Sequence, residues 1–155
     1  MADHRSKCEA QVRANLKNAQ QGTMLCIDPG STTMGWSMWI AGQLVGSGSI
    51  DNNHRVLNVR LKKLGEEMRT RFPNEVDLLV VEYIAPPNKK TVMRSYLRLI
   101  KSIGTIFGTV KWKYCIEVHP TVWQEYTDEG WTKGDKKDAE YIGKCVLGIC
   151  EELSN

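Results

Sequence analysis

Two acidic residues stand at the ends of apolar segments, where a charged side chain is unusual. Asp28 ends a short apolar run that begins at residue 24, and Pro29 and Gly30 follow it. Glu82 ends the apolar run of residues 78–81. A buried carboxylate is costly unless it is paired, hydrogen-bonded or bound to a metal. Taken alone, Asp28 is best explained as a turn residue whose side chain caps the Pro-Gly reversal.

Together the two acids favour a metal site. If their strands lie side by side and parallel, Asp28 and Glu82 meet at the same end of a sheet. Like charges repel there unless a cation lies between them. Mg²⁺ prefers such hard oxygen ligands, and two ions can activate water and stabilise the leaving oxygen in phosphodiester cleavage. The alternative for Glu82 is an ion pair with Lys89 or Lys90.

A third acidic site is expected at the start of the last helix. Asp135 and Asp138 stand three positions apart in the segment DKKDA, a spacing that places both on one face of a helix. Both could therefore point at the same metal ions. The alternative is that Asp135 caps the helix N-terminus and Asp138 interacts favourably with the helix dipole.

The spacing of apolar residues predicts the elements that position these acids. Three strands joined by tight turns come first, followed by alternating helices and strands. This order predicts an α/β fold in which an antiparallel meander and parallel strands form one mixed five-stranded sheet, with helices on both faces. Strands are expected at 24–28, 34–40, 44–50, 77–82 and 114–118, and helices at 54–71, 91–110, 120–126 and 136–153.

Composition fits one globular domain. Of the 155 residues, 41% are hydrophobic and 25% are charged, an ordinary globular balance. No apolar run approaches the roughly 20 residues that span a bilayer, and the charged N-terminus lacks the apolar core of a signal peptide. Five cysteines without a C-x-x-C pair favour reduced thiols over disulfides or structural zinc. We expect a cytoplasmic protein with no membrane partner.

Residues 1–22 are expected to form a polar N-terminal arm or one short helix, and residues 23–155 the main domain. The net charge is +3, compatible with nucleic acid but not diagnostic. Basic side chains near the acids could grip phosphates without reading sequence, and Tyr83 could stack on an unpaired base. The alternative for each lysine is a solvated helix face, and the alternative for Tyr83 is packing in the core or in a dimer interface. The residues expected to bind DNA are Tyr83, Lys89, Lys90, Arg94, Arg98, Lys133, Lys136 and Lys137.

The remaining aromatic residues and His119 favour structural roles. Trp36, Trp39, Trp112 and Trp123 are expected in the core or an interface. His119 follows an apolar strand near the acids, and a structural role is favoured over metal binding or proton transfer.

Three segments resemble RuvC-type Holliday junction resolvases of the RNase H-like superfamily. LCIDPGSTTMGWSMW resembles their first motif, an acid-Pro-Gly turn followed by a Gly-containing strand. LLVVEYIAPPNKKTVMRSYLRLIKSIGTIFGTV resembles their second motif, an apolar strand ending in Glu before a loop and a long helix. YCIEVHPTVWQEY resembles the next strand and the P-x-x-W segment of the phage versions. The match covers about residues 24–144.

The resemblance implies an RNase H-like nuclease domain of the phage type, in the host cytoplasm if phage-encoded. It implies that Asp28, Glu82 and Asp138 bind Mg²⁺, with Mn²⁺ able to substitute and two ions per site, and that Asp135 completes the catalytic set. It also implies a homodimer that hydrolyses four-way DNA junctions, a crossover junction endodeoxyribonuclease that leaves 5′-phosphate ends. Members of this family normally carry one more basic helix before the last acid pair, so that pair could instead lie beyond Asn155.

Two other functions stay open. One is a non-catalytic module of the same fold that binds branched DNA or a protein. The other is an actin- or sugar-kinase-like nucleotide-binding domain, which the segment Asp-Pro-Gly-Ser-Thr-Thr-x-Gly also resembles. Such ATPases need two lobes and a second Gly-rich phosphate loop, and the sequence shows neither. No nucleotide cofactor is therefore expected.

Overall fold

The computed structural model describes residues 3–30, 33–51, 53–89, 92–134 and 137–155. Each strand and helix expected from residue 24 onward is present, with small shifts at the ends. The strands are β1 (Thr23–Asp28), β2 (Thr33–Ile40), β3 (Gln43–Asp51), β4 (Val76–Glu82) and β5 (Trp112–Val118). The helices are α1 (His4–Arg13), α2 (Leu16–Gln21), α3 (Leu57–Arg71), α4 (Met93–Thr109), α5 (Pro120–Trp123), the 3-10 turn η2 (Gln124–Tyr126) and α6 (Asp138–Ser154).

The strands form one mixed sheet in the order β3-β2-β1-β4-β5. β1, β2 and β3 make the antiparallel meander, whereas β4 runs parallel to β1 and β5 parallel to β4. The predicted mixed five-stranded sheet is therefore confirmed. Because β1, β3, β4 and β5 share one direction, all of them finish at the same end of the sheet. We call this the acidic end, since Asp28 and Glu82 are the last residues of β1 and β4.

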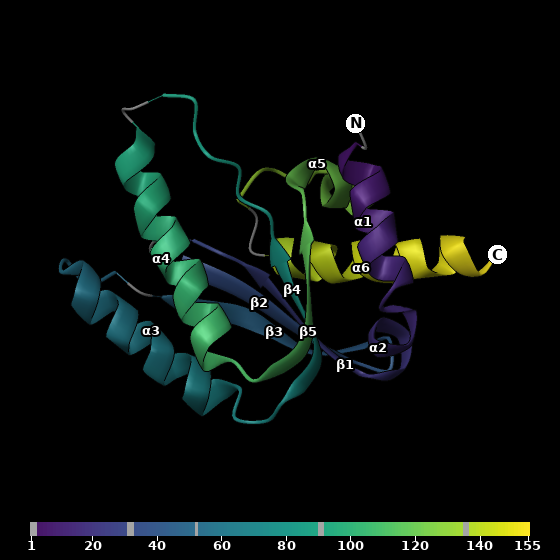
Figure 1. Cartoon of the computed structure of the whole chain (residues 1–155), viewed down its shortest axis with the longest axis horizontal. Coiled ribbons are helices and arrows are strands. Elements are labelled where there is room, and N and C mark those ends of the chain that lie inside the picture. Colours follow the sequence, from purple (N-terminus) through teal and green to yellow (C-terminus); the bar gives the residue numbers. More distant parts are fainter. Residues whose placement is uncertain (1–2, 31–32, 52, 90–91, 135–136) are drawn as a thin grey trace.

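Helices cover both faces of the sheet (Figure 1). α3 and α4 pack together on one face, and α1, α2, α5 and α6 lie on the other. Side chains alternate along each strand, so Leu25 and Ile27 pack beneath α3 and α4 while Met24 and Cys26 pack beneath α6. Burial on both faces accounts for the continuous apolar runs of β1 and β4. The same alternation turns Asp28 toward the α6 layer.

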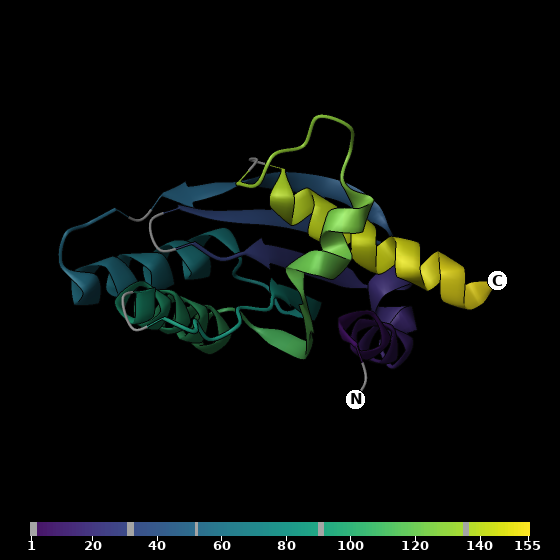
Figure 2. The same cartoon turned by 90° about the horizontal axis from the view of Figure 1, so that it is seen from above.

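Buried hydrogen bonds fix the first turn of α6 to β2. Ser37 Oγ donates to the carbonyl oxygen of Ala139 at 2.7 Å and accepts from Trp39 Nε1 at 2.9 Å. The Trp39 indole lies so close to α6 that a Cβ atom at Gly143 would overlap it. α6 contacts both β1 and β2 and lies over the sheet with its N-terminal part (Figure 2). These contacts hold Asp138, the residue before Ala139, over the sheet.

Residues 3–21 form the two helices α1 and α2, where an arm or one short helix was expected. Cys8 and Val12 of α1 and Ala19 of α2 are fully buried in the core under α6. Apolar side chains this sparse give too weak a periodicity for sequence to predict both helices. All of the cysteines are free thiols. Within the described ranges, no helix is both long and apolar enough to cross a bilayer.

α1 also covers part of the edge strand β5. The backbone N–H of Glu117 donates to Gln11 Oε1 at 2.9 Å, and Gln11 Nε2 donates to the Glu117 carbonyl oxygen at 3.3 Å. One side-chain amide therefore takes the place of a neighbouring strand at this position.

We predict that Ser37→Ala lowers the free energy of unfolding by about 1–3 kcal/mol, because it leaves two buried polar groups without their partner. Ser47→Ala is the matched control, since Ser47 is the exposed register partner of Ser37 on β3. Its effect should stay within about 0.5 kcal/mol. Urea unfolding of the two variants measures both values, and equal effects would contradict the anchoring role of Ser37.

Candidate active site

Three acidic residues from three elements meet at the acidic end. The register of β1 and β4 pairs Ile27 with Val81, so the residues that follow, Asp28 and Glu82, come side by side. Asp138 is the first residue of α6 and is only 4% exposed. Gly35 lies opposite Asp28 on β2, and a Cβ atom there would be 3.6 Å from that of Asp28 and 3.7 Å from that of Ala139. The start of α6 is thus close to the end of β1.

The carboxylates affect one another electrostatically. Burial raises the pKa of Asp28 to about 7, and the negative charge of Asp138 contributes to this. Burial, followed by the charge of Asp28, raises the pKa of Glu82 to about 8, although the nearby positive charge of Lys133 acts in the opposite direction. No described residue forms an ion pair with either side chain. The alternative prediction for Glu82, an ion pair with Lys89, is therefore wrong.

Two tryptophans orient two of the acids. Trp123 Nε1 donates to Glu82 Oε2 at 2.9 Å, and Trp131 Nε1 donates to Asp138 Oδ1 at 2.7 Å. The two indoles pack edge to face, with ring centroids 5.6 Å apart. We call Trp123 and Trp131 the tryptophan pair. Because an indole N–H only donates, the pair holds these carboxylates without neutralising them.

Sequence reasoning did not find this role of the tryptophan pair. Trp123 lies in the Pro120-x-x-Trp123 segment and was expected in the core or an interface, and it is indeed almost fully buried. The only signal for its role was the P-x-x-W pattern itself. Trp131 lies in the loop between η2 and α6, where no pattern of the sequence singles it out.

An acid at the opposite end of the sheet shows the contrast with a structural carboxylate. Asp77, near the start of β4, accepts from the backbone N–H of Thr23 at 2.9 Å and forms an ion pair with Lys113 at 3.3 Å. The Thr23 N–H, helped by Lys113, lowers the pKa of Asp77. Asp28 accepts no hydrogen bond from any described residue. Burial and the charge of Asp138 therefore disfavour the ionised form of Asp28, which raises its pKa.

The donor set at the acidic end suits a hard divalent cation. Its ligands would be the carboxylates of Asp28, Glu82 and Asp138, and Mg²⁺ and Mn²⁺ favour such oxygen atoms. Across the described ranges, no three His, Cys, Asp or Glu side chains are already drawn together as a metal cage. Carboxylates that repel one another do not close up by themselves. A bound cation would stabilise the charged forms of Asp28 and Glu82, which burial and then the neighbouring acids disfavour.

The residues expected to bind DNA fall into two groups. Tyr83 and Lys89 lie after β4, and Arg94 and Arg98 lie on α4, where the two arginines line a cavity of about 280 Å³ with Leu57, Leu97 and Lys101. Lys133 and Lys137 lie before α6, in the layer on the opposite face of the sheet. The two arginines and these two lysines therefore belong to the layers on opposite faces of the sheet. Lys90, Lys136 and the expected catalytic residue Asp135 lie outside the described residues.

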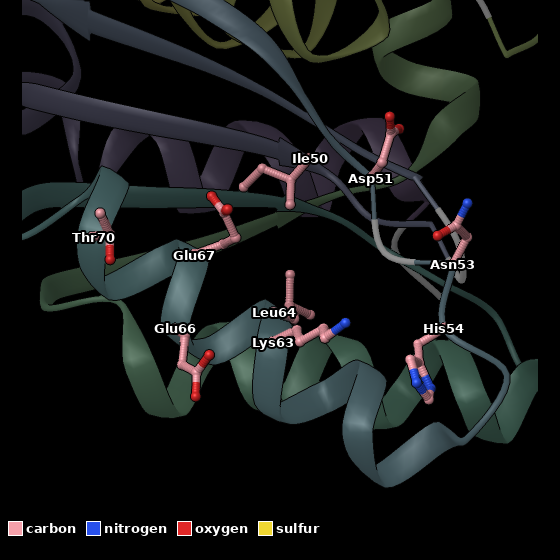
Figure 3. Close-up of a pocket in the computed structure, with 9 residues that line it drawn as sticks. All are labelled: Ile50, Asp51, Asn53, His54, Lys63, Leu64, Glu66, Glu67 and Thr70. Carbon is pink, nitrogen blue, oxygen red and sulfur yellow. The ribbon is translucent and has the colours of Figure 1, made fainter.

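A larger cavity, shown in Figure 3, lies away from these acids. It has a volume of about 440 Å³ and lies between β3 and α3. Ile50 and Leu64 at its base belong to the core under α3 and α4, the face opposite Asp28. Asp51, Glu66 and Glu67 place negative charge around it. Lys63 also lines this cavity, and its lining includes none of Asp28, Glu82 and Asp138. Volume therefore does not identify the candidate site.

Comparison with known proteins shows the fold. No family model matches the chain, and no curated protein matches its sequence. Among solved structures, the chain is similar to Thermus thermophilus RuvC in complex with a Holliday junction substrate, with a TM-score of 0.61 and 12% identity over 84% of this chain and 95% of that one. A second structure of Thermus thermophilus RuvC gives a TM-score of 0.55, also at 12% identity, over 85% of this chain and 96% of that one. The fold is therefore RuvC-like and RNase H-like, and the phage type stays a prediction.

We predict that Asp28→Asn stabilises the metal-free protein at high pH. The Asp28 pKa is raised in the folded state, so the folded chain binds this proton more tightly than the unfolded one. Stability is then lost as the pH rises from about 4 through 7. At pH 8.5 the variant should be more stable by about 2 kcal/mol, or roughly 4–8 °C in Tm. At pH 4 the two proteins should be equal.

Thermal unfolding in EDTA and in Mg²⁺ checks this prediction. Mg²⁺ should raise the Tm of the wild type and have little effect on Asp28→Asn. Asp77→Asn is the control of opposite sign, because the lowered pKa of Asp77 stabilises the fold above about pH 4. That variant should be less stable at pH 8.5. A destabilised Asp28→Asn at this pH would show that Asp28 is a structural acid.

Proposed function

We propose that the protein is a divalent-metal-dependent endonuclease that cleaves branched DNA, such as a four-way junction. The observation that carries the proposal is the meeting of Asp28, Glu82 and Asp138 from β1, β4 and α6, with none of the described basic residues paired to Asp28 or Glu82. Acids that only supported the fold would be neutralised, as Asp77 is. The fold shared with RuvC, whose complex with a Holliday junction substrate is one of the similar structures, supports the choice of substrate.

The chain contributes binding and orientation to this reaction. Asp28, Glu82 and Asp138 would hold Mg²⁺ or Mn²⁺, in two ions per site, and the tryptophan pair orients the carboxylates of Glu82 and Asp138 through its hydrogen bonds. When bound, such ions activate water and stabilise the leaving oxygen of a phosphodiester. Burial keeps the site partly dry, which strengthens every charge interaction in it. Asp135 is proposed as the fourth acid, beside Asp138.

The basic residues supply the grip on DNA. Lys133 is close enough to the acids to act on the pKa of Glu82, so it can bind a phosphate next to the reacting one. Lys89, after β4, and Lys137, before α6, extend this contact with DNA on the two sides of the acidic end. Lys90 and Lys136 are proposed to bind phosphate as well. Arg94 and Arg98 bind phosphates farther along α4, and this contact is sequence-neutral and salt-dependent.

We predict that Asp28→Asn lowers the nicking of a labelled four-way junction by at least about 100-fold in Mg²⁺ or Mn²⁺. Losing a group that merely orients a metal ligand is worth roughly 10–100-fold, so Trp131→Phe should reduce nicking by about 10-fold. Trp112→Phe is the matched control, because Trp112 Nε1 donates to a backbone carbonyl of α4, far from the acids. It should nick normally.

Gel analysis of the products decides between the proposals. Paired nicks on opposing strands, with 5′-phosphate ends, support a resolvase. An intact wild-type protein that binds the junction and never nicks it would instead be a non-catalytic binding module of the same fold.

We also propose that the protein acts as a homodimer through α4. Met93, Leu97 and Ile100 stand at helical spacing and are exposed on this helix, and an apolar stripe of this kind fits a helix-to-helix interface. A two-fold dimer places two sites on opposing strands of a symmetric junction. This arrangement explains why nicks should come in pairs.

Leu97→Glu tests the dimer. Leu97 is 51% exposed, and Val45 on β3, at 56%, is the matched control. We expect a dimer for the wild type and Val45→Glu in sedimentation velocity, and a monomer for Leu97→Glu at the same micromolar concentration. Burying the Leu97 side chain stabilises the dimer by about 1.5–3 kcal/mol for each subunit. The dissociation constant of the dimer should therefore rise at least about 100-fold in Leu97→Glu. A monomeric wild type would refute the dimer.

A further inference from the structure

Beside the acidic end lies a cavity that the proposed reaction does not use. It has a volume of about 220 Å³ and lies between α1 and the ends of β4 and β5. Tyr83 directly follows Glu82, and His119 directly follows Val118, which is the register partner of Glu82. The cavity is therefore next to the Glu82 side of the acidic end. Its lining residues are His4, Lys7, Gln11, Tyr83, Glu117 and His119.

Three rings form one part of the cavity. His4 and His119 are stacked, with centroids 3.6 Å apart and planes 12° from parallel. The Tyr83 ring lies 5.8 Å from His119 and is tilted by 30°. We call the rings of His4, Tyr83 and His119 the ring cluster. Tyr83 is 36% exposed, and His4 is exposed as well, so the cluster is open to a ligand.

The ring of His119 is held in place before any ligand arrives. The backbone N–H of Thr121 donates to His119 Nδ1 at 3.2 Å, and the Thr121 hydroxyl lies 2.8 Å from the same nitrogen. Because Nδ1 accepts, the neutral ring carries its proton on Nε2. Burial, and then the neighbouring His4, lower the pKa of His119. A neutral, pre-oriented ring loses little entropy when a flat ligand stacks on it.

The cavity also carries one charge of each sign. Lys7 and Glu117 line it and are exposed, and neither forms an ion pair with a residue that the structure describes. The two hydrogen bonds with Gln11, one accepted and one donated by its side-chain amide, fix the backbone at Glu117. An ammonium group binds a phosphate. A carboxylate accepts a hydrogen bond from the exocyclic amino group of a base, such as N4 of cytosine.

We propose that this cavity binds one unpaired nucleotide, with its base against the ring cluster, its phosphate on Lys7 and its exocyclic amino group donating to Glu117. Bases stack well on aromatic rings whatever their sequence. The carboxylate of Glu117 adds a preference for cytosine, adenine or guanine over thymine, which has no such amino group. The part of this inference that assigns the nucleotide to a DNA junction rests on the proposed function. Nucleotide binding itself needs only the residues of the cavity.

Fluorescence of 2-aminopurine, a base that loses emission when it stacks, tests the inference. The probes are a single-stranded oligonucleotide and a four-way junction, each with one 2-aminopurine, the latter at the crossover. The full chain is titrated in EDTA, which separates binding from cleavage. We expect wild-type protein to quench both probes.

His4→Ala, His119→Asn and Tyr83→Ala should each weaken binding of the single strand about five-fold or more, since stacking on one aromatic side chain contributes at least that much. His119→Asn keeps an acceptor for the Thr121 N–H at the start of α5, so the fold is preserved. Tyr114→Ala is the matched control, because Tyr114 is a tyrosine 55% exposed on β5 but outside the cavity. Lys7→Glu should weaken binding, whereas Lys17→Glu on α2 should not.

Competition by unlabelled strands tests the role of Glu117. A strand with cytosine should displace the probe at a several-fold lower concentration than one with thymine, and Glu117→Ala should remove the difference. Quenching that all the ring variants retain would overturn the inference, even if the junction is bound and nicked. Quenching of the single strand that depends on the ring cluster, in a protein that never binds the junction, would uphold the nucleotide site and refute the proposed substrate.

Discussion

Three carboxylates of like charge share the partly buried end of one sheet, and repulsion between them is the constraint around which the site is built. Two of them carry raised pKa values, because burial and neighbouring charge both disfavour ionisation. A fold that gathers such groups must hold them in place by contacts that do not themselves carry the opposite charge. The indole N–H groups of the tryptophan pair meet that requirement. A lysine in the place of either indole would instead have formed an ion pair with the carboxylate, which would disfavour the binding of a cation there.

The rest of the fold keeps these acids together. Parallel pairing of β1 and β4 brings Asp28 and Glu82 to one end, and both strands are anchored by apolar side chains on two faces. Asp138 belongs to another element, and its position depends on the junction of α6 with β2. Ser37 and Trp39 provide that junction from inside the core. The position of Asp138 at the acidic end thus depends on a small buried network of hydrogen bonds between Ser37, Trp39 and Ala139.

Much of this arrangement could be predicted from sequence, because the relevant signals are local. Acids at the ends of apolar runs indicated Asp28 and Glu82, and the order of elements indicated the sheet. The face of the sheet on which Arg94 lies could not be predicted from sequence, because it depends on how α4 packs against the sheet. Trp131 lies in a loop, and its bond to Asp138 forms only when the loop folds over α6. For residues 1–22 the sequence predicted a polar arm or one short helix instead of the two helices α1 and α2, because the buried residues of these helices are few.

The amide of Gln11, which pairs with the backbone of Glu117 at the edge of the sheet, has a consequence for how the chain is made. A bare strand edge invites pairing with another chain, and β5 carries the exposed Trp112 and Tyr114 beside its edge. α1 is synthesised first and β5 last among the strands. When β5 leaves the ribosome, the group that blocks its edge is already present on the same chain. An intermolecular strand that paired with β5 at Glu117 would have to displace Gln11 first.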